Sequence, residues 1–154
     1  MGQFLSTLKT EQVRQGTLST SAKYRLTSPL IYESNTLNQI IIVPAGFITD
    51  FATVPRLPFI YSLLGNLGHA AATLHDFLYT EPHLAFKGSN KYVNRKLADK
   101  ILQGAIVDGM IADIDKDAIA TITQSFKTIS YIAIGFLFYI GVRIGGASHW
   151  ERTK

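Results

Sequence analysis

The sequence contains no cysteine, which excludes disulfide bonds, zinc sites built on thiolates and cysteine nucleophiles. Charged residues are also few. They make up 17% of the chain against 47% for hydrophobic residues, a balance typical of globular and not of disordered proteins. The 15 Lys and Arg outnumber the 11 Asp and Glu and give a formal charge of +4, but they form no basic block along the sequence. We therefore do not expect nucleic-acid binding from the sequence.

Residues 1–16 lack the apolar core of a secretory signal peptide. Residues 128–142 (TISYIAIGFLFYIGV) form an uncharged run between Lys127 and Arg143. As a helix this run would span about 22 Å, which is short of the ~30 Å hydrocarbon core of a bilayer. We expect a central helix that is buried on all sides, with membrane association through residues 128–142 as the alternative.

The first third of the chain has the pattern of β-strands. Residues 21–27, 29–34 and 37–46 are short segments rich in Ile, Tyr and Thr, and Ser, Pro, Asn and Gly separate them. Residues 34–36 (Ser-Asn-Thr) predict a turn between two antiparallel strands. The proline-rich segment 44–58 predicts a stiff loop, because each proline fixes its own φ and removes a backbone donor.

Beyond this loop the apolar residues recur at helical spacing, which predicts helices over about residues 62–79, 90–107 and 117–144. For the third helix, Asp115–Asp117 suit the start and Gly145 and Gly146 suit the end. Strands followed by helices predict an α+β fold, with a small antiparallel sheet from the N-terminal third followed by three helices. The length and the lack of repeats or linkers predict a single domain over residues 1–154.

Chemistry-bearing side chains gather in residues 68–80 (GHAAATLHDFLYT). His69 and His75 are two of the 4 histidines, and Asp76 follows directly. On a helix, His69 and Asp76 are seven residues apart and share a face, whereas His75 is rotated from Asp76 by about 100°. A buried Asp76 would need a partner, and the candidates are Arg56, His69, a metal ion or backbone amides of the proline-rich loop.

Two other aspartates are candidates. Asp50 lies among apolar residues in ITDFATVPR, so it is either an acid or base with a shifted pKa or a residue that caps a turn. Arg56 is expected to pair with one of the aspartates. Asp99 follows Arg95 by four residues, which predicts a surface ion pair. We therefore expect the loss of Asp76 to destabilise the protein more than the loss of Asp99.

His75 and Asp76 are also candidate ligands of a divalent metal, because imidazole nitrogens and carboxylate oxygens are good ligands. The sequence has no HExxH motif or other metal motif defined by spacing. Three interpretations stay open for these residues: a metal site, an acid–base site, or polar groups that only hold the loop.

Four blocks in order, PAGFITDFATVPR (44–56), HDFLY (75–79), RKLAD (95–99) and a glycine-containing segment ending in Trp150, resemble the phage-associated family catalogued as domain of unknown function 1353. The resemblance covers about residues 40–150. It aligns Asp50, His75, Asp76 and Asp99 with polar blocks of the family, and Thr53 stands where serine is usual. It implies a protein of the host cytoplasm or the virion, with other phage proteins as partners, and no established activity.

We expect a pocket under the proline-rich loop with Asp50, His75 and Asp76 as catalytic candidates. Arg56, His69 and Asp99 would support them. An enzyme of this kind would hydrolyse an amide or a phosphoester through a water activated by a carboxylate or a metal. The alternatives are a non-enzymatic virion or accessory protein and a membrane-associated lysis factor. The sequence has no nucleophile elbow and no glycine-rich phosphate loop, which disfavours acyl-enzyme and nucleotide chemistry.

Overall fold

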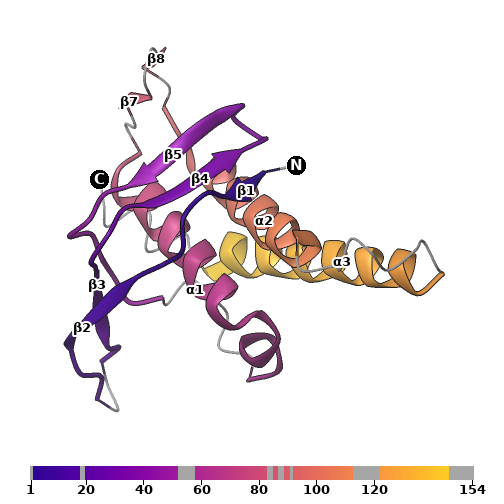
Figure 1. The fold of residues 1–154 in the computed structure, drawn as a ribbon, viewed down its shortest axis with the longest axis horizontal. Helices are drawn as coiled ribbons and strands as arrows, with labels where there is room; N and C mark the ends of the chain where they lie inside the picture. Colours follow the sequence, from indigo (N-terminus) through magenta and orange to yellow (C-terminus); the bar gives the residue numbers. More distant parts are fainter. Residues whose placement is uncertain are drawn as a thin grey trace.

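The computed structural model describes residues 2–17, 20–51, 58–82, 85–86, 89–90, 92–112 and 122–145. The elements are β1 (Gln3–Phe4), β2 (Thr10–Arg14), β3 (Lys23–Leu26), β4 (Leu30–Ser34), β5 (Gln39–Val43), β6 (Ile48–Thr49), α1 (Pro58–Thr80), β7 (Ala85–Phe86), β8 (Ser89–Asn90), α2 (Arg95–Ala112) and α3 (Ile122–Gly145). The expected α+β class, with N-terminal antiparallel strands followed by three helices, is confirmed (Figure 1).

The strands form two small antiparallel sheets, with strand orders β1-β4-β5 and β2-β3-β6, and β7 pairs with β8 in a separate hairpin. In Figure 1, β2 and β3 extend away from the helices. All five residues of β2 are exposed, in agreement with this placement. The first sheet therefore supplies most of the contact with the helices, and the second sheet carries a projecting ribbon.

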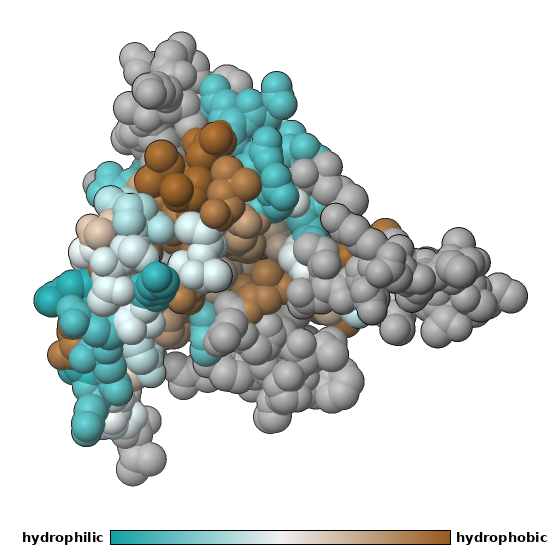
Figure 2. Space-filling model, viewed as in Figure 1, coloured by the Kyte–Doolittle hydropathy of each residue, from teal (hydrophilic) through white to brown (hydrophobic). Residues whose placement is uncertain are grey.

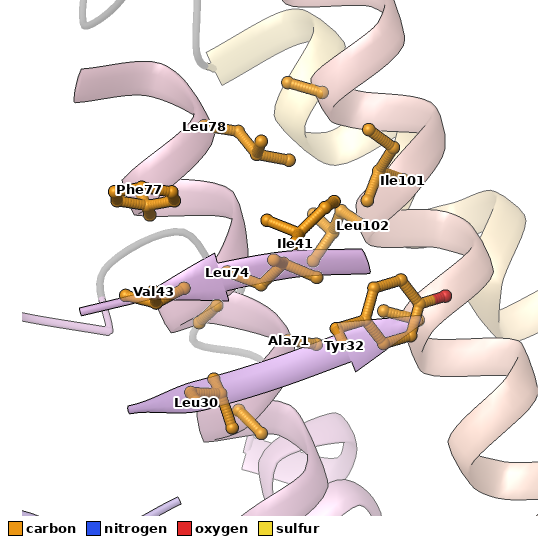
Figure 3. Packing of buried hydrophobic residues seen from close by; sticks show 14 of the residues in the cluster. Leu30, Tyr32, Ile41, Val43, Ala71, Leu74, Phe77, Leu78, Ile101 and Leu102 are labelled. Carbon is orange, nitrogen blue, oxygen red and sulfur yellow. The ribbon is translucent and has the colours of Figure 1, made fainter. Parts of the chain in front are cut away.

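Alternation along β4 and β5 builds the core face of the first sheet. Leu30 and Tyr32 of β4 are buried opposite Val43 and Ile41 of β5, so the four side chains share one face. Helices α1 and α2 lie against this face (Figure 1). Figure 3 shows the helix side chains in this cluster: Ala71, Leu74, Phe77 and Leu78 of α1, and Ile101 and Leu102 of α2.

The helices pack in chain order, with α2 between α1 and α3. Gly135 of α3 faces α2, and a Cβ atom there would lie 2.5 Å from Cγ2 of Val107. This distance is too short for a real contact, so glycine lets α3 approach α2 closely at this point.

The ends of α1 and α3 lie within one residue of those expected, whereas α1 begins four residues earlier and α2 begins and ends five residues later than expected. Helix α1 begins at Pro58, the first helical position, where the missing N–H of proline costs no intrahelical bond. Helix α2 begins after Asn94, whose Oδ1 accepts a hydrogen bond from the backbone N–H of Leu97 at 2.9 Å, so Asn94 is its N-cap. The expected start of the third helix, Asp115–Asp117, lies outside the described residues, as does the part of the proline-rich loop at residues 52–57.

The prediction that residues 128–142 are buried on all sides is wrong. Phe138 and Val142 are buried in the core cluster. The other side of α3 carries five large apolar side chains with exposed fractions from 38% to 62%: Ile129, Ile132, Phe136, Leu137 and Ile140. We call these five residues the outer face of α3. The prediction failed because apolar residues occupy both sides of α3, and among the described elements it packs mainly against α2. In the described part of the chain, no helix is both long enough and apolar enough to cross a membrane.

Candidate functional site

His75 and Asp76 are adjacent on α1, and they point to different parts of the molecule. His75 contacts Asp99 of α2, whereas Asp76 contacts Thr49 of β6. The 100° rotation between successive helical residues explains this separation. The candidates from the sequence therefore divide into two groups, one between the helices and one between β6 and α1.

The first group is a buried network centred on Asp99. Oδ1 of Asp99 lies 2.9 Å from Nε2 of His75 and accepts a hydrogen bond from the hydroxyl of Tyr79 at 2.6 Å. Oδ2 accepts a hydrogen bond from Nη1 of Arg143 on α3 at 3.2 Å. The side chains of His75 and Asp99 are 2% and 0% exposed. We call these residues, together with Arg95, the Asp99 network.

Arg95 extends the network to the C-terminal end of α3. Its Nε lies 3.4 Å from the hydroxyl of Tyr79, and its Nη2 donates to the backbone carbonyls of Val142, at 3.0 Å, and Arg143. Carbonyls in the last turn of a helix lack intrahelical partners, and a cation there also complements the helix dipole. The Asp99 network thereby joins all three helices.

The prediction of a surface ion pair between Arg95 and Asp99 is wrong, although the two charged groups do approach to 4.0 Å. Asp99 precedes Leu102 by three residues and Ile106 by seven, and both are fully buried, so Asp99 lies on the stripe of α2 that faces the core. The i, i+4 spacing in the sequence identified the pair but not the side of the helix on which Asp99 lies.

The hydrogen bonds keep Asp99 in its charged form. Burial by itself would raise the pKa of Asp99, but the hydrogen bonds from His75 and Tyr79, the electrostatic interaction with His75 and the hydrogen bond from Arg143 outweigh burial and lower the pKa. Burial, and then the hydrogen bond to Asp99, raise the pKa of Tyr79, so its hydroxyl stays protonated and remains a donor.

The lowered pKa of Asp99 predicts an acid-sensitive contribution to stability. A group whose pKa is lower in the folded state stabilises the fold above its unfolded pKa, and this contribution is lost as the pH falls through the folded pKa. We expect the free energy of unfolding of the wild type to decrease as the pH is lowered below about 4. The decrease should be smaller for Asp99→Asn in urea denaturation at several pH values. Parallel curves for the two proteins would contradict this prediction.

The second group lies where β6 meets α1. The hydroxyl of Thr49 donates to Oδ2 of Asp76 at 2.5 Å, and its oxygen accepts a hydrogen bond from the backbone N–H of Phe51 at 3.2 Å. The ring of Phe51 stacks on His69 with centroids 4.5 Å apart. His69 and Asp76 therefore meet the same short segment, and half-buried Asp50 lies within it.

Phe51 has a φ of 55°, in the left-handed region that bulky residues rarely adopt. Its ring is held between Tyr24, at a centroid distance of 4.8 Å, and His69. Burial lowers the pKa of His69, which favours the neutral imidazole in this stack. The strained backbone and the contacts on both sides fix the position of Asp50 relative to α1.

The two groups do not support a metal shared by His75 and Asp76, since these residues direct their side chains to different partners. Within the described residues, no three His, Asp or Glu side chains are placed to hold a metal ion. Arg56 lies outside the described residues.

Four residues of these groups were not identified as site candidates in the sequence: Thr49, Tyr79, Arg95 and Arg143. Tyr79 lies one helical turn after His75, and Arg95 one turn before Asp99, so helical spacing was an available signal for both. Arg143 follows the apolar run of α3. Its partner Asp99 lies on α2, so only the packing of α3 on α2 identifies the contact. Nδ1 of His75 is buried and has no hydrogen-bond partner within the described residues.

Comparisons with known proteins give one match. The family model described as "Protein of unknown function (DUF1353)" matches residues 24–118, which is more than half of the chain. No curated protein and no solved structure matches the sequence. The matched range contains Asp50, His75, Asp76 and Asp99, whereas Arg143 lies beyond it. The chain belongs to the DUF1353 family of proteins of unknown function.

Proposed function

We propose that this protein is a non-enzymatic phage accessory protein that works by binding another protein through the outer face of α3. The observation that carries the proposal is the exposure of five large apolar side chains on one side of a single helix. Contiguous apolar surface of this kind is unusual on a protein that acts alone and marks interaction sites.

The spacing of these residues fits a helical recognition surface. Ile129, Ile132, Phe136 and Ile140 follow one another at intervals of three or four residues, so they form one stripe. This pattern is the one that amphipathic helices use to enter an apolar groove or to pair with another helix. Phe138 and Val142 attach the opposite side of α3 to the core, so we do not expect folding to require the stripe.

A protein partner fits this surface better than a lipid surface does. Helices that lie on membranes carry basic residues beside their apolar stripe. The sequence of α3 has two charged residues, Lys127 and Arg143, one at each end of the apolar stripe, and the guanidinium of Arg143 is bonded to Asp99. The Asp99 network supports the same interpretation, because its hydrogen bonds fasten three helices together and give α3 a fixed position.

A photocrosslinking amino acid at position 136 tests this proposal in cells that carry the gene. We expect one defined protein to be crosslinked at position 136 and none at position 100, where exposed Lys100 of α2 is the control. Ile132→Asp should abolish the crosslink without lowering the melting temperature, since exposed positions change stability by only about 0.5 kcal/mol or less. Crosslinks to lipid alone, or the same products at both positions, would contradict the proposal.

A second candidate function, hydrolysis, is favoured by a different observation. In this proposal Asp99 accepts a hydrogen bond from Nε2 of His75 and orients the ring. Nδ1, which has no hydrogen-bond partner among the described residues, is then the proton acceptor. In this proposal Nδ1 takes a proton from water as the water oxygen attacks an amide carbon or a phosphoester phosphorus. The proton then passes to the leaving group. Asp50, Asp76 and His69 belong to the other group of residues, on a different side of α1, so His75 and Asp99 would carry the proton transfer by themselves. Because His75 is 2% exposed, the site would have to open for a substrate to enter.

The hydrolysis proposal predicts that His75→Gln abolishes turnover while His69→Gln retains most of it. Purified protein would be assayed against phosphomonoesters, phosphodiesters and peptides, with and without added Mg²⁺, Mn²⁺ or Zn²⁺. Circular dichroism would verify that both variants are folded. If wild-type protein turns over none of these substrates, or both variants lose activity equally, His75 is not the base.

A further inference from the structure

The sheet formed by β2, β3 and β6 has one face toward the interior and one toward solvent. Tyr24 and Thr49 are cross-strand partners on the inner face, where Tyr24 packs on Phe51. Side chains alternate along a strand, so Lys23 and Arg25, on either side of Tyr24, lie on the outer face. Figure 2 shows hydrophilic residues over this part of the molecule, at the lower left where Figure 1 places β2 and β3.

A β-bulge brings a third basic residue to the outer face. The register pairs Gln12 with Tyr24 and Arg14 with Lys23, so β2 advances by two residues while β3 advances by one. Cross-strand partners share a face, which places Arg14 beside Lys23. Without the bulge, Arg14 would alternate onto the inner face with Gln12. Re-aiming a side chain is a known effect of bulges.

Lys9 completes the set. It precedes Glu11 by two residues, and Glu11 is the cross-strand partner of Arg25, so alternation places Lys9 on the outer face. We call Lys9, Arg14, Lys23 and Arg25 the basic face. All four are exposed, and with Glu11 they carry a net charge of +3. The same alternation places half-buried Asp50, between inward-facing Thr49 and Phe51, at the edge of this face, which then carries +2 in total.

Most of this charge is unneutralised. Within the described residues, Glu11 is the only acidic group in an ion pair with the basic face, through Nη1 of Arg25 at 3.1 Å. Arg14 donates to the backbone carbonyl of Ser21, which leaves its charge in place. The basic residues are scattered in the sequence, and the fold gathers four of them on one surface.

From this arrangement we propose that the basic face binds the phosphate backbone of double-stranded nucleic acid without reading its sequence. The stretch from Lys9 to Arg14 is about 16 Å long at the rise of a β-strand. A duplex presents about one phosphate charge per 1.7 Å of its axis, so several phosphates lie within reach of such a ribbon. Charge complementarity therefore identifies the ligand as a polyanion.

A duplex fits better than a single strand or a membrane. Proteins that hold single strands stack the bases on exposed aromatic rings. Tyr24, the aromatic residue of these three strands, faces inward. The exposed large apolar residues of these strands are Val13 and Ile48, and two such side chains give little insertion into a bilayer. The basic face lies on β2 and β3, whereas the proposed protein-binding surface is on α3, so the two proposals are independent.

Fluorescence anisotropy with a labelled 20-base-pair DNA duplex tests the proposal. Three unpaired cations predict a slope of about −2.7 for log association constant against log salt, or a loss of about 40-fold between 50 and 200 mM salt. Arg14→Ala with Lys23→Ala should reduce the slope to about −0.9, a loss of only 3- to 4-fold over the same range. Glu11→Gln should steepen the slope by about 0.9, because it releases Arg25.

The matched control is Lys96→Ala with Lys100→Ala, which removes the same charge from exposed positions on α2. We expect this control to keep the wild-type slope. The proposal is overturned if the wild type does not bind the duplex at 50 mM salt, or if the two double variants change the slope equally. It is also overturned if the protein binds vesicles of phosphatidylglycerol and phosphatidylcholine but not the duplex.

Discussion

Replacing Asp99 with alanine is expected to lower the free energy of unfolding by about 3–5 kcal/mol, the usual cost of removing one partner from a buried ion pair. Asp99 is fully buried and accepts hydrogen bonds from Tyr79 and Arg143 besides its contact with His75. Its loss removes a buried acceptor that Tyr79, His75 and Arg143 share. A typical domain has only about 5–15 kcal/mol of stability in total, so the variant should be close to unfolding.

Urea denaturation followed by circular dichroism measures this cost, with Glu11→Ala as the control. Glu11 also pairs with an arginine, but the side chains of Glu11 and Arg25 are 54% and 48% exposed. Exposed pairs contribute about 0–1 kcal/mol. Similar midpoints for the two variants would show that the Asp99 network does not fasten the helices.

This expectation reverses the order of cost inferred from the sequence, where Asp76 ranked above Asp99. Asp76 is half-buried, and Thr49 donates to it through a single hydroxyl. Asp99 is fully buried and accepts hydrogen bonds from groups on α1 and α3. The sequence could place the two aspartates on helices, but the depth of each depends on which stripe of α2 meets α1, and that is decided by tertiary packing.

The fold class could be predicted because the spacing of apolar residues along each strand or helix depends on the geometry of that element. Apolar and polar residues alternate along β4 and β5, and apolar residues recur at helical spacing in α2, because each of these elements buries one side. Strands β1 and β6 have two residues each, too few for a period to be visible. Strand β2 is exposed throughout, so it has no apolar alternation to detect.

The candidate site was predictable only in part for a similar reason. Helical geometry correctly separated His75 from Asp76 and placed His69 on the side of Asp76. It could not supply Arg143, which is 44 residues from Asp99 in the sequence and reaches it only through the packing of α3 on α2. Nor could it predict the φ of Phe51, which depends on the contacts of its ring with Tyr24 and His69.

Two phenylalanines of α3 test whether the helix is attached by one side. Phe138 is fully buried, and Phe136 is 51% exposed on the opposite side. We expect Phe138→Ala to lower the free energy of unfolding by about 3–5 kcal/mol, through lost burial and the cavity left behind. Phe136→Ala should change it by about 0.5 kcal/mol or less. Both variants remove the same atoms from the same helix, so helix propensity cancels in the comparison.

Chemical denaturation of the two variants at one protein concentration gives the difference directly. A large loss for Phe136→Ala would mean that the outer face of α3 is covered in solution, either by another part of the chain or by a second copy. Repeating the measurement at a tenfold lower concentration separates these cases, because only a contact between copies weakens on dilution. If Phe138→Ala lowers the free energy of unfolding and Phe136→Ala leaves it unchanged, the apolar stripe has no role in folding. Binding to a partner is then the remaining explanation for its exposure.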